Sequence, residues 1–153
     1  MKNFQLSVLL SFIRHLVPVT LIFFVTALIR YPFFSNSDHF FSSDEGLMAN
    51  TIWTLLNGGP LVFYYDFVRY FGLTFGLVSA PFMWILGGSK TLAFNLPGVL
   101  FYSLYVWTTY LIARIIVPRM AFLVLVLMLV TPSFITKMTT HNWPHVPSAF
   151  FGN

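Results

Sequence analysis

Charge is scarce in this chain, and all of its acidic residues are confined to one segment. Asp and Glu together number four among 153 residues, and all four lie within residues 35–69. Long apolar stretches flank that segment. A soluble domain carries roughly a quarter charged residues, whereas this chain carries 8% and is 58% hydrophobic. The sequence therefore predicts an integral membrane protein whose acidic segment lies outside the hydrocarbon.

The remaining composition excludes several classes of function. The net charge of +4 reflects the scarcity of acids, and there is no run of Lys or Arg of the kind that binds nucleic acid. The chain has no cysteine, which excludes disulfides, thiolate catalysis and Cys-based metal sites. Nothing in the composition indicates a cofactor.

The first predicted span begins in the uncharged stretch Leu16–Ile29. It reaches the roughly 20 residues that a span needs by continuing past Arg30 to Phe34, with the Arg30 side chain extending to the membrane interface. A cleaved signal peptide is the alternative, because Val25-Thr26-Ala27 suits a cleavage site. The span is favoured, since no soluble segment follows.

Of the three remaining apolar stretches, two are expected to span the membrane and one is not. Tyr70–Gly88 is uncharged but rich in glycine, which suits a broken or surface-lying helix better than a span. Thr91–Ala113 and the Leu/Val/Met run from Met120 to about Ile135 are the second and third predicted spans. Arg114 and Arg119 bracket the tight loop between them.

The placement of basic residues decides between three and four spans. With three spans, the cytoplasmic basic residues are Lys2, Arg14, Arg114 and Arg119, and the external ones are Arg30, Arg69, Lys90 and Lys137. Four spans divide the basic residues equally as well, but the short loop with two arginines favours a cytoplasmic position for that loop. We expect an all-α membrane protein with about three transmembrane helices and amphipathic juxtamembrane helices in the first external loop. Its N-terminus is cytoplasmic, residues 35–92 are external, and four spans remain the alternative.

A short amphipathic helix is predicted in the acidic segment. Ser42 and Glu45 have the spacing of a capping box, and Gly58-Gly59-Pro60 is a typical stop. Its apolar face comprises Met48, Ile52, Leu55 and Leu56. Such a helix can lie along a membrane surface. Its dipole favours the ionised form of Asp44 at the N-terminus.

A series of short motifs occurs along the chain in a characteristic order. They are Asp44-Glu45-Gly46, Asn57-Gly58-Gly59-Pro60, Phe63-Tyr64-Tyr65-Asp66, Ala80-Pro81-Phe82, Asn95-Leu96-Pro97-Gly98 and Thr131-Pro132. This order, over most of residues 15–137, resembles the N-terminal part of family 39 membrane glycosyltransferases and the related aminoarabinose transferases, of the C-type superfamily. Members are several times longer and have more spans. The resemblance thus implies that residues 1–153 are one membrane domain, the N-terminal fragment of a longer enzyme, and inactive alone.

The resemblance implies transfer of a sugar from a polyprenyl-phosphate donor to an acceptor hydroxyl of a protein, lipid or glycan on the non-cytoplasmic face. By motif match, Asp44 is the base that activates that hydroxyl. A single carboxylate can suffice, because the phosphate leaving group departs already charged. A glycosidase would instead need two carboxyl groups across the scissile bond. The alternative role of Asp44 and Glu45 is to cap the helix and keep the loop in water.

The other candidate site residues have competing explanations. Glu45 fits a capping partner better than a second catalyst. Tyr65 and Asp66 can bind a sugar acceptor, although an interfacial aromatic belt with a solvated acid explains them better. Arg69, with Lys90, can meet a lipid phosphate or lipid headgroups in general.

His141 and His145 have i, i+4 spacing, but Pro144 between them disfavours a helix, so no metal site is predicted. The family often carries a second acid in this region, which leaves substrate binding open for the two histidines. A non-enzymatic membrane subunit or an inactive remnant remains the alternative function. A transporter is disfavoured, because its ionisable residues would lie at mid-membrane.

Overall fold

The protein is mainly helical. A computed structural model describes the backbone of residues 2–35, 43–61, 64–65, 68–72, 74–87, 91–132 and 135–136, and the side chains of residues 14–33, 45–61, 76–87, 91–132 and 135–136. Its helices are α1 (Lys2–Ser35), α3 (Ser43–Leu56), α4 (Thr74–Leu77), α5 (Ala80–Leu86), α6 (Thr91–Ile116) and α7 (Ala121–Leu129). A short antiparallel pair, β1 (Tyr64–Tyr65) and β2 (Val68–Gly72), is the only β-structure among these residues. The predicted helical architecture is confirmed apart from this pair.

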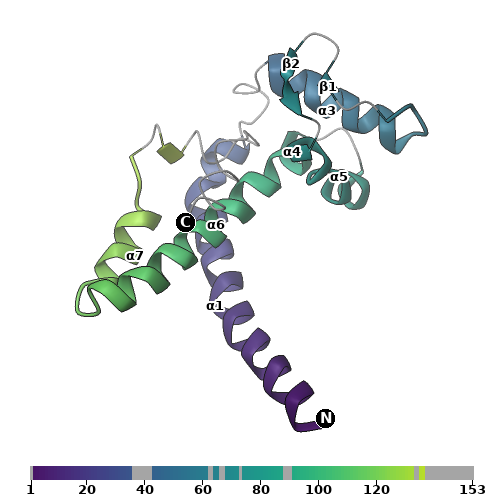
Figure 1. Ribbon diagram of the computed structural model, residues 1–153. Helices are drawn as coiled ribbons and strands as arrows, with labels where there is room; N and C mark the ends of the chain where they lie inside the picture. Colours follow the sequence, from purple (N-terminus) through teal and green to yellow (C-terminus); the bar gives the residue numbers. More distant parts are fainter. Residues whose placement is uncertain are drawn as a thin grey trace.

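Three helices form the long part of the molecule. Helix α6 runs back across α1 and contacts it, and α7 turns back along α6, so that the chain passes up, down and up again (Figure 1). The elements between α1 and α6 gather at the end where α1 stops and α6 begins (Figure 1). We refer to α3, β1, β2, α4 and α5 together as the lobe. The lobe thus occupies one end of the three-helix part.

Two helices are long and apolar enough to cross a membrane, namely Arg14–Phe33 of α1 and all of α6. The predicted helix over Thr91–Ala113 is confirmed, since α6 covers it. Helix α7 has only 9 residues, which at 1.5 Å per residue is about 14 Å, against roughly 30 Å of hydrocarbon. The third predicted span is therefore not confirmed. After a bend at Val130, Pro132 is poorly suited to continue a regular helix.

Residues 70–88 contain no helix long enough to cross a membrane in the part that is described. They comprise the end of β2, the four-residue α4 and the seven-residue α5. Helix α5 stops at Gly87, whose φ of 81° is a left-handed conformation that glycine adopts without strain. The prediction that this stretch is broken and forms no single long helix agrees with the described residues.

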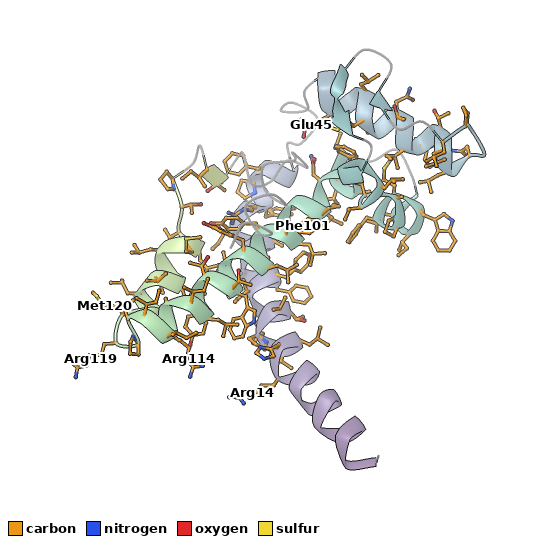
Figure 2. The ribbon with its side chains drawn as sticks, in the orientation of Figure 1. Arg14, Glu45, Phe101, Arg114, Arg119 and Met120 are labelled. Atoms are coloured by element: carbon orange, nitrogen blue, oxygen red, sulfur yellow. The ribbon has the colours of Figure 1, made fainter. Side chains whose placement is uncertain are left out.

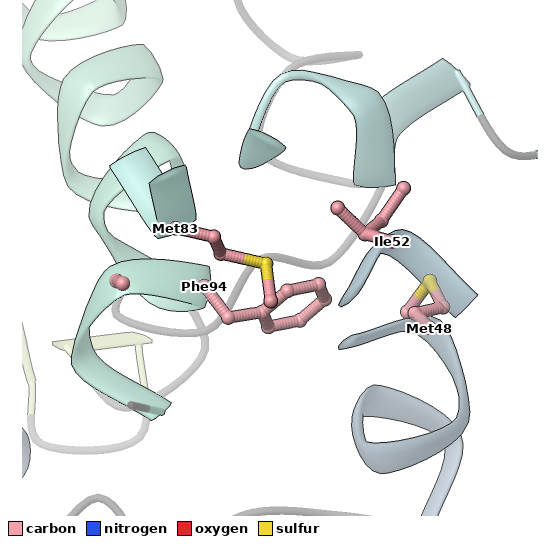
Figure 3. Packing of buried hydrophobic residues seen from close by; sticks show 5 residues of the cluster. Met48, Ile52, Met83 and Phe94 are labelled. Carbon is pink, nitrogen blue, oxygen red and sulfur yellow. The ribbon is translucent and has the colours of Figure 1, made fainter. Parts of the chain in front are cut away.

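The lobe has a small hydrophobic core that joins it to α6. Met48 and Ile52 of α3, Met83 of α5, and Ala93 and Phe94 of α6 are buried together (Figure 3). The prediction that Met48 and Ile52 lie on the apolar face of α3 is thus confirmed. This face is not free to lie on a membrane surface, because it packs against α5 and the start of α6.

The end of α3 is a Schellman motif. The Gly58 amide donates to the Leu55 carbonyl at 3.1 Å, and the Gly59 amide donates to the Thr54 carbonyl at 2.9 Å. Gly58 has a φ of 84°, in the left-handed region. The predicted stop at Gly58-Gly59-Pro60 is confirmed.

Gly58→Ala is expected to lower the free energy of unfolding by about 1–2 kcal/mol, because a Cβ disfavours the left-handed conformation. Nothing lies within 4 Å of that Cβ, so the cost is one of backbone conformation and not of a clash. Gly58→Asn is the matched control, since Asn tolerates this conformation better. Thermal unfolding in detergent would measure both variants. Equal stability of the Ala and Asn variants would contradict the assignment.

Candidate functional site

The predicted catalytic residue, Asp44, is the second residue of α3. Its backbone lies in the first turn, where unpaired amide groups and the helix dipole favour an anion. Ser42, the predicted cap, lies outside the described residues, as does the side chain of Asp44. The proposed capping box is therefore untested, while the helix itself begins one residue after the predicted start.

Glu45, the neighbour of Asp44, is completely buried. Figure 2 shows it at the start of α3, on the lobe. Burial of a carboxylate is costly unless the group is paired or hydrogen-bonded, and Glu45 does take part in interactions within the protein. A role in which Glu45 only keeps the loop in water is therefore wrong.

Two further candidates belong to the β pair. Tyr65 is on β1, where it pairs with Val68, and Arg69 is on β2. Strand β1 contacts α3, so the backbones of Asp44, Tyr65 and Arg69 belong to one lobe. Asp66, His141, His145 and Lys90 lie outside the described residues.

A polar cluster that the sequence reasoning missed joins the three long elements. Arg30 of α1 is completely buried, and its guanidinium carbon lies 4.2 Å from the centre of the Tyr102 ring of α6. The Tyr102 hydroxyl group donates a hydrogen bond to the carbonyl oxygen of Met128, near the end of α7. We call these residues, with the adjacent Thr131, the Arg30–Tyr102 cluster. The expectation that Arg30 extends to a membrane interface is wrong, because the side chain turns inward onto Tyr102.

Other polar side chains of these helices are also buried, while many of their apolar side chains are exposed. Thr26 of α1 and Asn95 and Ser103 of α6 are also completely buried. Exposed apolar side chains cover the outside of these helices, among them Leu21, Leu28, Ile115, Phe122 and Leu127. The sequence signal for the cluster was Arg30 itself, a charged residue in an apolar stretch, which is a mark of a functional or packing role.

The lobe carries the carboxylates of Asp44 and Glu45 and the basic group of Arg69. The described residues contain no group of His, Asp or Glu that could hold a metal ion. A lone carboxylate in the first turn of a helix can act as a base or bind a cation or hydroxyl donor. For sugar transfer, the required role of such a carboxylate is that of a base.

In comparison with known proteins, the chain matches no family model, no curated protein and no solved structure. The glycosyltransferase resemblance therefore depends on the sequence motifs.

Proposed function

We propose that the chain is the N-terminal membrane part of a glycosyltransferase that uses a polyprenyl-phosphate sugar. It transfers the sugar to a hydroxyl of a protein, lipid or glycan acceptor on the external face of a bacterial plasma membrane. Asp44 is the base in this proposal, and no cofactor takes part. Helices α1 and α6 cross the bilayer, and residues 120–135 form a third span that begins with α7.

The membrane placement is supported by the distribution of polar and apolar side chains. Only 17% of the α1 window and 28% of the α6 window is buried, whereas the core helix of a soluble protein would be mostly buried. Leu28 is 74% exposed and Ile115 is 83% exposed, while Arg30 and Asn95 are 0% exposed. In water this arrangement is unfavourable, since it hydrates apolar surface and buries polar groups. Surrounded by lipid, the same arrangement is favourable.

The orientation is supported by the charges at the two ends. Arg14, Arg114 and Arg119 lie toward one end of the three-helix part, and Glu45 lies toward the other (Figure 2). The positive-inside rule assigns the arginine end to the cytoplasm. The lobe, with residues 35–92, is then external.

One observation carries the catalytic proposal. The chain holds α3, with Asp44 in its first turn, in a lobe between the end of α1 and the start of α6 (Figure 1). A lipid-linked donor presents its phosphate and sugar at this level of a membrane, and a hydrophilic acceptor approaches from the aqueous side. A carboxylate here can take the proton of an acceptor hydroxyl as the sugar carbon forms its new bond and the lipid phosphate leaves.

Because the chain has no cysteine, single cysteines can test the orientation without background. Asn50→Cys lies on an exposed part of α3, and Pro118→Cys lies in the exposed α6–α7 turn. An impermeant maleimide added outside intact cells is expected to label position 50 and not position 118. In inverted membrane vesicles the expected pattern is reversed. Labelling of both positions from the same side would refute the proposed topology.

Catalysis is tested separately, by release of polyprenyl phosphate from a radiolabelled polyprenyl-phosphate sugar. The protein is used as its gene encodes it, in native-like vesicles. Wild-type protein that turns over none of the polyprenyl-phosphate pentoses or hexoses offered would overturn the enzymatic proposal. It would favour a non-enzymatic membrane subunit.

A further inference from the structure

The end of the three-helix part that lies away from the lobe is basic. Arg14 of α1, Arg114 at the end of α6 and Arg119 in the following turn are all exposed, and they lie toward this end (Figure 2). Glu45, the one acid whose side chain is among those described, lies toward the other end (Figure 2). We call this region the arginine end.

Aromatic rings connect α1 to the arginines of the arginine end. The rings of His15 on α1 and Trp107 on α6 meet edge to face, with 6.0 Å between their centres. Trp107 stacks on Tyr110 at 5.4 Å, and the Arg114 guanidinium carbon lies 6.0 Å from the centre of the Tyr110 ring. Trp and Tyr are the residues that favour the headgroup level of a bilayer. The rings thus form a row of contacts from α1 to Arg114.

A tight turn keeps Arg119 at the same end. The Val117 amide donates to the Ala113 carbonyl at 2.8 Å, and the Met120 amide donates to the Val117 carbonyl at 2.9 Å. Large apolar side chains adjoin the arginines directly: Ile115 and Ile116 are 83% and 71% exposed, and Phe122 is 71% exposed. The surface therefore changes from cationic to apolar within a few residues.

We propose that the arginine end binds the headgroup of an anionic phospholipid of the cytoplasmic leaflet, such as phosphatidylglycerol. A planar guanidinium group matches the oxygens of a phosphodiester, and Arg114 and Arg119 each present one. The acyl chains of the lipid then lie along the exposed Ile115 and Phe122 side chains. An acidic protein or nucleic acid would satisfy the arginines but would leave this apolar surface in water. The inference rests on the proposed membrane placement and is independent of sugar transfer.

The test is native mass spectrometry of the full chain, released from vesicles that contain equal amounts of phosphatidylglycerol and phosphatidylcholine. Retained phosphatidylglycerol is expected to exceed retained phosphatidylcholine by roughly tenfold, since each basic group near a surface contributes substantially to anionic lipid binding. The variant Arg114→Gln/Arg119→Gln is expected to lose this preference. The control Lys137→Gln removes a basic charge on the opposite side of the proposed topology, and the preference should remain.

A second variant keeps the proposal testable if the double Arg variant fails to fold. Arg119→Gln alone changes one exposed turn residue and is expected to lower the preference by about threefold. Equal retention of both lipids by the wild-type chain would overturn the proposal. So would an unchanged preference in the double Arg variant, or an equal loss in the lysine control. Failure of the membrane placement itself is a distinct result, because the chain would then be extracted from vesicles by alkaline carbonate.

Discussion

Asp44→Asn is expected to lower the rate of sugar transfer by about 10²–10⁴-fold, the range over which a positioned base contributes to catalysis. Asn has nearly the same shape, and losing the charge near the helix N-terminus costs only about 0.3–1 kcal/mol. The substitution therefore removes the proton acceptor and leaves α3 in place. The measurement is polyprenyl phosphate release at saturating donor, with the protein as its gene encodes it.

The matched control is Asp38→Asn, which makes the same chemical change at another acid of the same segment and should leave the rate unchanged. Thermal unfolding of both variants separates a loss of base from a loss of fold. If Asp44→Asn retains the wild-type rate while the wild-type protein turns over donor, Asp44 is not the base. The proposal for this residue then fails, although the proposal for the enzyme class does not.

Tyr102→Ala is expected to lower the free energy of unfolding by about 3–5 kcal/mol, as is common when a buried aromatic side chain is truncated. The ring is 3% exposed, and it carries both the contact to Arg30 and the hydrogen bond to the Met128 carbonyl. Its loss leaves the guanidinium of Arg30 buried without the ring that faces it. All three long elements, α1, α6 and α7, should then separate more easily.

Two control variants divide this effect into parts. Tyr102→Phe keeps the ring beside Arg30 and removes only the hydroxyl group, with an expected cost of about 1 kcal/mol. Tyr110→Ala truncates a half-buried ring of the same helix, and it should cost less than Tyr102→Ala because less apolar surface loses its contacts. Unfolding in detergent with increasing denaturant measures all three. A Tyr102→Ala variant as stable as Tyr102→Phe would show that the ring does not join the helices.

The predictions that succeeded concern features set by neighbouring residues. The helix over residues 91–113, the apolar face of α3 with Met48 and Ile52, and the stop at Gly58 all agree with the structure. The first depends on the length of an apolar run, the second on helical periodicity and the third on the backbone freedom of glycine, and all three are properties of neighbouring residues. The same local reasoning identified residues 70–88 as unsuited to a single long helix.

The predictions that failed or stayed open concern side-chain contacts, the end of one helix and the role of Asp44. Arg30 was expected at an interface, yet it lies over Tyr102, which is 72 positions away in the chain. Glu45 was expected to cap α3 beside a solvated loop, yet its side chain is completely buried. The run after Met120 was expected to form a full span, yet its helix stops at Leu129, because apolar composition alone does not determine where a helix ends. The catalytic role of Asp44 remains a prediction.

The sequence by itself determined that the chain is apolar, poor in acids, helical, and basic at Arg14, Arg114 and Arg119, since these properties follow from residue types and short spacings. Only the tertiary structure decided that Arg30 turns inward and that α3 packs on α5 and α6. It likewise set the His15 ring of α1 against the Trp107 ring of α6. The physical reason is that a buried polar group, or an apolar face, is stable only with a partner. Such partners come from distant segments that periodicity cannot identify.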